Sequence, residues 1–319
     1  MNYTYMGIDI GGTTIKFGVF TKEGELLKKW AVSTNISGNG QNIIPDIYKE
    51  IQTYLNTKDQ SPIYGIGLGI PGPVNKDGYV ENCVNLGWRH TNPAQELAAL
   101  LKNIPTAADN DANVAALGEC FYGAGKGMEN IFMVTLGTGV GGGTVINGRI
   151  VNGFQGLSGE IGHIPVNPRE SQKCNCGNIG CLDQIASANG IVRYVKNLLE
   201  SSQKASLLRN LPSLTASEIT AAAASGDSLA NEGLEYCMAC LGKSLSIVSH
   251  IIDPEMFIIG GGVSKAGPFL LPMIQKGYDA CMFLKRSKAQ IRLAKLSGDG
   301  GIYGAAKLAM QLQDKHSKN

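Results

Sequence analysis

The sequence lacks a strong charge of either sign. Its 319 residues carry 28 Lys and Arg against 26 Asp and Glu, a formal net charge of +2, so neither a nucleic-acid partner nor a membrane surface is indicated. It also lacks an uncharged apolar run of membrane-spanning length. Residues 1–12 contain no basic segment that leads into an apolar one, so no signal peptide is expected. With no signal peptide and no membrane span indicated, a cytoplasmic protein is expected.

The sequence has no G-x-x-x-x-G-K-S/T phosphate-binding motif. Residues 137–142 do match the glycine fingerprint of dinucleotide-binding domains, but that fingerprint must open a helix. Here the glycines lead into residues 144–146 and then into Asn147-Gly148, the preferred pair for a tight hairpin turn. We therefore predict a strand, a glycine turn and a second strand, which excludes a Rossmann domain.

What the sequence does have is glycine, with 42 residues that gather at the ends of predicted strands. The strand expected at residues 5–10 ends in Gly11-Gly12-Thr13-Thr14, and a second strand is expected at 15–20. Asp9 interrupts the first strand, and a buried carboxylate is costly without a partner. One interpretation is that Asp9 faces a metal-bound phosphate held by the turn, but the turn taken alone slightly favours an ordinary hairpin, because glycine turns are common. Residues 130–146 repeat this plan, which suggests two phosphate-holding hairpins.

The rest of the chain alternates between segments with the apolar spacing of strands and segments with the apolar spacing of helices. Its length suffices for two domains. Further strands are expected at 25–33, 63–71, 105–108, 255–259 and 290–296. Helices are expected at 41–55, 93–101, 114–120, 186–200, 215–224, 229–252, 268–282 and 302–312.

Four polar side chains crowd the junction between the strand at 105–108 and the following helix, at Asp109, Asn110, Asp111 and Asn113. Asp and Asn are good helix N-caps, but one cap needs one residue. Such a junction also lets a carboxylate project from a rigid frame toward a ligand. We therefore favour a binding or catalytic site here over a cap alone.

A cysteine cluster lies within residues 159–183, where Cys174, Cys176 and Cys181 form a C-x-C-x4-C pattern preceded by Glu160 and His163. Three thiolates and one imidazole are the right number and type of ligands for a tetrahedral structural zinc ion. The alternative is three buried thiols, or a disulfide and a spare thiol. A zinc ion would make this loop rigid and would hold still Glu160, His163 and Asp183.

Together these segments resemble the ROK family of sugar kinases, within the actin-like ATPase superfamily, and its bacterial glucokinases most of all. The resemblance covers nearly the whole chain. It is carried by DIGGTTIK (9–16), GIPGPVN (69–75), NDAN (110–113), TLGTGVGGG (135–143), GEIGH (159–163), CNCGNIGCLD (174–183) and GGGV (260–263). The order and spacing of GEIGH and the cysteine loop are the most specific of these signals.

The resemblance implies an α/β fold of the actin-like (ribonuclease H-like) type, with two domains and a cleft between them. The expected N-terminal domain is residues 1–110 plus a closing helix at 300–319, and the expected C-terminal domain is 111–299 with the zinc loop. ATP, with Mg²⁺, is expected at Asp9, Gly11, Gly12, Thr13, Gly137, Thr138, Gly260, Gly261, Gly262 and Val263. The hexose is expected at Asn85, Asn110, Asp111, Glu160, His163 and Asp183, and structural Zn²⁺ at His163, Cys174, Cys176 and Cys181.

Phosphoryl transfer needs charge neutralisation and in-line positioning, and a sugar hydroxyl needs a base to accept its proton. We assign the role of this base to Asp111. His163 has two ring nitrogens, so it could bind zinc through one and a sugar hydroxyl through the other. The family commonly has Glu where this chain has Asp183, and the shorter side chain leaves the identity of the sugar open.

The resemblance implies ATP-dependent phosphorylation of glucose to glucose 6-phosphate, a step of glycolysis, by a cytoplasmic homodimer. N-acetylmannosamine or N-acetylglucosamine is the alternative substrate. The family also contains sugar-responsive repressors, which carry an additional N-terminal winged-helix module. The first hairpin begins at Tyr5, which leaves no room for that module. A non-catalytic sugar sensor is disfavoured because Asp9 and Asp111 are both present.

Overall fold

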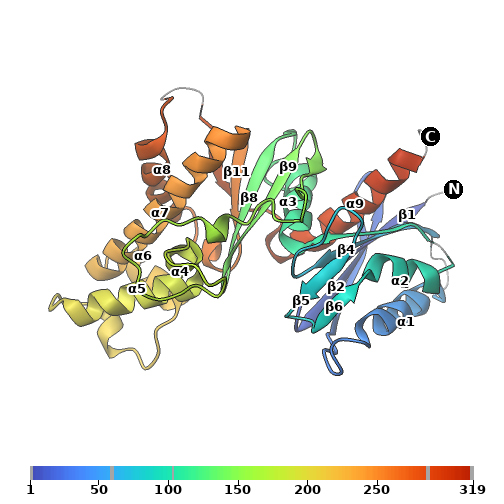
Figure 1. Cartoon of the computed structure of the whole chain (residues 1–319), viewed down its shortest axis with the longest axis horizontal. Helices are drawn as coiled ribbons and strands as arrows, with labels where there is room; N and C mark the ends of the chain where they lie inside the picture. The colour runs from blue at the N-terminus through green and yellow to red at the C-terminus, as the bar shows by residue number, and fades with distance from the viewer. Residues whose placement is uncertain (1–2, 58–60, 103, 285–287, 317–319) are drawn as a thin grey trace. The chain divides into compact units, whose positions relative to one another are not determined.

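A computed structural model describes residues 3–57, 61–102, 104–284 and 288–316. The chain divides into two compact units. Figure 1 shows the whole chain, coloured by residue number. Unit 1 comprises Met1–Glu129, Gly143–Ser158 and Lys295–Asn319, and unit 2 comprises Asn130–Gly142 and Gly159–Ala294. Among the described residues, no helix has both the length and the apolar character needed to cross a membrane.

Unit 1 is built on a five-stranded sheet with the order β3-β2-β1-β4-β7. Its strands are β1 (Thr4–Ile10), β2 (Thr14–Thr21), β3 (Leu26–Ser33), β4 (Ile63–Ile70) and β7 (Thr106–Asn110). β1 pairs with β2 in the predicted antiparallel hairpin, and β1, β4 and β7 run parallel. The carboxyl ends of parallel strands share one sheet edge, and the register places Asp9 beside Gly69 and Gly69 beside Asp109. The sheet thereby brings two of the predicted polar positions to one edge.

Helices α1 (Ile43–Leu55) and α2 (Pro93–Leu100) confirm two of the expected helices of this unit. Every isoleucine of α1 is buried, and they join the apolar side chains of the sheet in one core. A two-stranded sheet of β5 (Val80–Cys83) and β6 (Trp88–Thr91) was not expected from the sequence.

The closing helix α9 (Gly300–His316) lies against β1 and β4 through direct backbone contact (Figure 1). A Cβ atom added at Gly7 would lie 1.9 Å from the Ile302 carbonyl oxygen, and one at Gly67 would lie 1.8 Å from that of Ala305. Only glycine permits so close an approach. α9 therefore packs backbone to backbone on the N-terminal strands of unit 1, and residues 317–319 lie outside the described part.

Helix α3 (Asp111–Tyr122) belongs to unit 1 for the same reason. A Cβ atom at Gly304 of α9 would lie 1.7 Å from the Val114 carbonyl oxygen. At Gly118 of α3, a Cβ atom would lie 2.3 Å from the carbonyl oxygen of Gly300. The observed grouping thus differs from the expected boundary at residue 110, because glycines let α3 and α9 pack backbone to backbone.

The second sheet has the order β10-β9-β8-β11-β12. Its strands are β8 (Ile131–Leu136), β9 (Val140–Ile146), β10 (Arg149–Ile150), β11 (Met256–Gly260) and β12 (Gln290–Leu293). The turn between β9 and β10 has φ of 51° at Asn147 and 68° at Gly148. Positive φ at both positions is the type I′ geometry that Asn-Gly favours. The prediction of strand, glycine turn and strand at residues 130–146 is confirmed.

The helices of unit 2 follow the expected pattern with shifted ends. They are α4 (Asp183–Ala186), α5 (Ala188–Ser201), α6 (Ala216–Ala224), α7 (Ser228–Ile252) and α8 (Leu270–Cys281), with short 3-10 turns η1 (Ile161–His163), η2 (Leu207–Asn210) and η3 (Val263–Ala266); a further turn, η4 (Ser297–Asp299), precedes α9. The predicted helix at 186–200 is divided at Ser187, whose ψ of 164° is extended and whose side chain accepts a hydrogen bond from Gly190 N. Ser187 is the N-cap of α5.

Candidate active site

The corner between β7 and α3 contains a helix cap directly beside the Asp111 carboxylate. The Asn110 side chain caps α3 by accepting hydrogen bonds from the backbone N–H groups of Ala112 and Asn113, and its Nδ2 donates to Gly72 O at 3.0 Å. The helix therefore begins at Asp111, three residues before the sequence predicted. The helix cap, which was the less favoured interpretation of these residues, is therefore present. Asp111 lies next to the cap, at the first position of the helix.

Asp109 and Asn113 hold this corner from inside. Both are buried, and Asp109 Oδ1 accepts a hydrogen bond from Asn113 Nδ2 at 3.0 Å. Asn152 Nδ2 donates to both carboxylate oxygens of Asp109, at 2.8 and 2.7 Å. Burial raises the pKa of Asp109, and the bonds from Asn152 and Asn113 oppose that rise. These contacts fix the frame from which Asp111 projects.

The Asp111 carboxylate, at the start of α3, has a raised pKa. Burial, and next the negative charge of Asp9, raise the pKa of Asp111 from 3.8 to about 6. Burial also raises the pKa of Asp9, and the Lys16 ammonium partly offsets that rise. Two carboxylates that disfavour each other's charge suit a general base beside a cation site. Lys16, the last residue of the DIGGTTIK segment, donates to Gly298 O at 2.6 Å.

The first glycine turn is tied to the strand next to its hairpin. Gly11 N donates to Thr14 O at 2.9 Å, and the Thr34 side chain donates to Gly11 O at 2.6 Å. Gly12 and Thr13 remain exposed between these contacts. These contacts hold the turn in one conformation, and its exposed residues Gly12 and Thr13 follow Asp9 by three and four positions.

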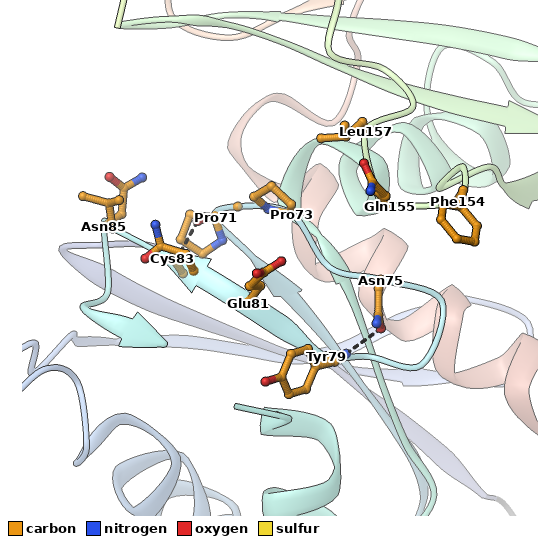
Figure 2. Close-up of a pocket in the computed structure, with 13 residues that line it drawn as sticks. Pro71, Pro73, Asn75, Tyr79, Glu81, Cys83, Asn85, Phe154, Gln155 and Leu157 are labelled. Atoms are coloured by element: carbon orange, nitrogen blue, oxygen red, sulfur yellow. Dashed lines mark hydrogen bonds between the residues drawn. The ribbon is translucent and has the colours of Figure 1, made fainter. Parts of the chain in front are cut away.

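Unit 1 contains a pocket of about 770 Å³, which is within the size range of small-molecule sites. Asn85, predicted as a sugar ligand, lies at one end of the pocket beside Cys83, and Phe154 lies at the other end (Figure 2). Glu81 projects between these ends. The lining combines carboxylate and amide groups with exposed apolar side chains, a combination suited to a sugar. The remaining lining residues are Pro71, Gly72, Pro73, Asn75, Tyr79, Asn82, Val84, Gln155 and Leu157.

Unit 2 contains a second pocket of about 530 Å³ beside the second glycine turn. Four of the residues predicted to bind nucleotide line it, namely Gly137, Thr138, Gly262 and Val263. The turn after β11 requires glycine, because Gly261 has φ of 87° and a Cβ atom there would lie 2.5 Å from Leu136 O. The sequence did not predict the rest of the pocket lining, most of which comes from α6. These lining residues are Ala188, Ala216, Ser217, Thr220, Ala221, Ala224, Lys265 and Ala266.

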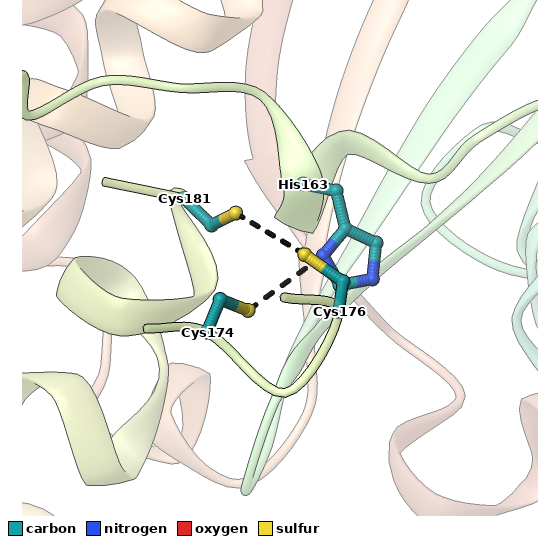
Figure 3. Close-up of side chains that lie close together, drawn as sticks. All are labelled: His163, Cys174, Cys176 and Cys181. Carbon is teal, nitrogen blue, oxygen red and sulfur yellow. Dashed lines mark hydrogen bonds between the residues drawn. The ribbon is translucent and has the colours of Figure 1, made fainter. Parts of the chain in front are cut away.

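The histidine and the three cysteines of the predicted metal site come together in unit 2. Their ligand atoms all lie within 4.8 Å of one another. Cys174 Sγ is 3.9 Å from His163 Nδ1, and Cys176 Sγ is 3.6 Å from Cys181 Sγ (Figure 3). Tetrahedral zinc with bonds of about 2.3 Å requires sulfur atoms about 3.8 Å apart. A disulfide would require about 2.05 Å, and all these cysteines are free. The donor set therefore fits zinc.

His163 Nε2 faces Glu160, whose Oε2 lies 3.8 Å away. Because Nδ1 is directed at the sulfur atoms, metal binding there would leave the proton on Nε2. Both side chains are about two-fifths exposed. They are therefore exposed enough to offer a donor and an acceptor to a ligand.

Asp183 has a partner that the sequence did not predict. Its Oδ1 accepts a hydrogen bond of 2.6 Å from Val140 N, at the end of the second glycine turn. Asp183 thus contacts the turn that begins with Gly137 and Thr138, two of the residues expected to bind nucleotide. The predicted site residues therefore form two groups. Unit 1 holds Asp9, Gly11, Gly12, Thr13, Asn85, Asn110 and Asp111, and unit 2 holds Gly137, Thr138, Glu160, His163, Cys174, Cys176, Cys181, Asp183 and Gly260 to Val263.

Comparison with known proteins gives matches over nearly the whole chain. The sequence model of the ROK family matches residues 5–312. A glucokinase of Halalkalibacterium halodurans is 39% identical over 98% of this chain and 97% of that protein. A glucokinase of Thermotoga maritima is 33% identical over 95% of this chain and 96% of that protein. The solved structure of a ROK family glucokinase from Streptomyces griseus, in complex with glucose and AMPPNP, has a TM-score of 0.77 at 33% identity and covers 97% of this chain and 99% of that one.

Proposed function

The chain belongs to the ROK family, and on this premise we propose that it is an ATP-dependent glucokinase that makes glucose 6-phosphate. Its fold is the two-domain α/β fold of the actin-like ATPases, as the fold of its structural relatives indicates. The observation that carries the proposal is the Asp111 carboxylate, held at the start of α3 with a pKa raised to about 6. Glucose and ATP are proposed as the substrates because the chain is similar to glucokinases, one of which was solved with glucose and AMPPNP.

Asp111 acts as the general base. A group with a pKa of about 6 is mostly ionised at neutral pH, yet it is a stronger base than an ordinary carboxylate. It accepts the proton of the glucose 6-hydroxyl as that oxygen bonds to the γ-phosphorus. The bond between the γ-phosphorus and its bridging oxygen breaks, and ADP leaves with that oxygen. The buried bonds of Asp109 keep Asp111 in place during this step.

The nucleotide is assigned to Asp9, Gly11, Gly12 and Thr13 of unit 1 and to Gly137, Thr138 and Gly260 to Val263 of unit 2. The exposed turn residues offer backbone N–H groups for phosphate oxygens. The raised pKa values of Asp9 and Asp111 fit a bound cation, because a positive charge would relieve their mutual repulsion. Mg²⁺ bound near them would neutralise charge on the transferred phosphoryl group.

The sugar is assigned to Asn85, Asn110 and Asp111 of unit 1 and to Glu160, His163 and Asp183 of unit 2. Carboxylates accept hydrogen bonds from sugar hydroxyls, and amides and the His163 Nε2–H donate to them. Zn²⁺ is assigned to His163, Cys174, Cys176 and Cys181, where it would fix the loop that carries these sugar ligands. The proposal further takes the protein to be a cytoplasmic homodimer that acts in glycolysis, as the family resemblance implies.

ADP release with MgATP across glucose, mannose, N-acetylmannosamine and N-acetylglucosamine tests the proposed function. We expect kcat/KM for glucose to exceed that for each other sugar by at least about tenfold, because a poor fit of one substituent commonly changes kcat/KM by that amount. A preference for an N-acetyl sugar would keep the mechanism and replace the substrate. A folded, zinc-loaded protein inactive on every sugar would contradict the assignment as a kinase.

A further inference from the structure

The segment Asp183–Asn189 makes hydrogen bonds to three residues of the second glycine turn. Val140 N donates to Asp183 Oδ1 at 2.6 Å. Ala188 N donates to Gly137 O at 2.8 Å, and Asn189 Nδ2 donates to Thr138 O at 3.2 Å. Main-chain atoms of the turn are thus bound on both sides of Gly139 by one short stretch of the chain.

The held turn forms part of the pocket in unit 2. Gly137, Thr138 and Ala188 line this pocket of about 530 Å³. Within the turn itself, Gly137 N donates to Gly139 O at 2.9 Å. Glycine has more conformational freedom to lose than any other residue, so outside contacts decide which conformation such a turn adopts. The contacts from Asp183, Ala188 and Asn189 are of this kind.

Asp183 also continues directly from the cysteine loop. Cys181 precedes it by two residues, and Gln184 N donates to Cys181 O at 3.0 Å. Leu182 N donates to Ile164 O at 2.9 Å, next to His163. The four candidate metal ligands and the glycine turn are therefore joined through a few residues with fixed backbone contacts.

The approach of Asp183 to the turn is close. A Cβ atom added at Gly139 would lie 2.9 Å from Asp183 Oδ1, which is tighter than side chains accept. Asp183 itself is only partly exposed. The Asp side chain reaches Val140 N directly.

From this geometry we propose that Asp183 is a positioning residue for the nucleotide, in addition to any contact with sugar. Its carboxylate holds Val140 N, sets the conformation of the Gly137–Gly139 turn, and links that turn to the cysteine loop. The inference rests on the proposed function in one respect, because it takes the pocket in unit 2 to be the nucleotide site. It goes further by making nucleotide affinity depend on a residue assigned to the sugar.

Calorimetric titration with MgADP in the absence of sugar tests this role. We expect Asp183→Ala to raise the Kd for MgADP by about tenfold, the loss associated with a hydrogen bond to a charged group. Asp183→Asn keeps an acceptor oxygen and should recover most of the affinity. Asn189→Ala, which removes only the bond to Thr138 O, should raise the Kd about threefold and leave glucose affinity unchanged.

The matched control is Asn197→Ala, the same change at an exposed position of the same helix, and it should bind MgADP like the wild type. An MgADP affinity unchanged in both Asp183→Ala and Asn189→Ala would overturn the inference, even if glucose affinity fell. If Asp183→Ala does not fold, Asn189→Ala alone decides the matter. A wild-type protein that binds neither MgADP nor glucose would contradict the proposed function itself, which is a separate outcome.

Discussion

Asp111→Asn is expected to lower kcat for glucose phosphorylation by about 10²- to 10⁴-fold, the usual contribution of a general base. Asn has nearly the same shape as Asp and keeps an acceptor for the Ala112 N–H, which donates to Asp111 Oδ1 at 2.8 Å. The change therefore removes the proton acceptor and little else. KM for both substrates should change far less than kcat.

The same substitution should stabilise the fold. The folded pKa of Asp111 is raised from 3.8 to about 6, so the native state binds this proton more tightly than the unfolded state and loses stability as pH rises between those values. Above the folded pKa the penalty is complete, and its upper limit is about 3 kcal/mol. Removing the charge should raise the melting temperature near neutral pH, and by less at about pH 5 than at about pH 8.

Thermal unfolding at these two pH values, together with steady-state kinetics, checks both effects. Lost activity with a raised melting temperature would separate a removed base from a damaged fold. Near-full turnover by a folded Asp111→Asn protein would show that the base is another group. Asp77→Asn is the matched control because Asp77 is exposed and is not among the residues that line the pocket of unit 1.

Cys176→Ser is expected to lower the free energy of unfolding by about 4 kcal/mol, the upper range for single substitutions, because it removes one ligand of the proposed zinc ion. Cys176 is exposed, so the substitution costs little packing. The loosened loop carries Glu160 and His163, and affinity for glucose should fall at the same time. Strong chelation of the wild-type protein should have both effects as well.

Cys281→Ser is the control for this substitution. Cys281 is also an exposed thiol of unit 2, outside the metal cluster. Metal analysis should find about one zinc per chain in the wild type and in Cys281→Ser, and less in Cys176→Ser. Zinc-free protein with unchanged stability and glucose affinity would rule out the metal as the organiser of the loop.

Local signals in the sequence predicted most elements of the fold. The strand, turn and strand at residues 130–146 were predicted because the glycines lead into residues 144–146 and the Asn147-Gly148 turn instead of a helix. The β5–β6 pair escaped because residues 80–91 do not alternate apolar and polar side chains over a useful length. The start of α3 was placed too late because the apolar period begins at Val114, after the cap.

The residues of the site were easier to predict than their partners. Asp111 could be singled out from its position after a strand, but its pKa depends on burial and on Asp9, which is far away in sequence. The bonds from Asn152 to Asp109 and from Val140 to Asp183 each join residues 43 positions apart. Single-sequence patterns do not encode such pairs. The contact of α3 with α9, which decides the grouping of the units, depends likewise on glycines that meet only in the fold.

The pH dependence of glucose phosphorylation tests the central claim most directly, which is that Asp111 accepts the proton of the sugar hydroxyl. The rate should be measured between about pH 5 and about pH 8 with both substrates well below KM and Mg²⁺ in excess, so that it reports the free enzyme. We predict a plateau above a pKa of about 6 and a fall toward tenfold per pH unit below it. A rate independent of pH over this range, or the same fall in Asp111→Asn, would contradict the claim.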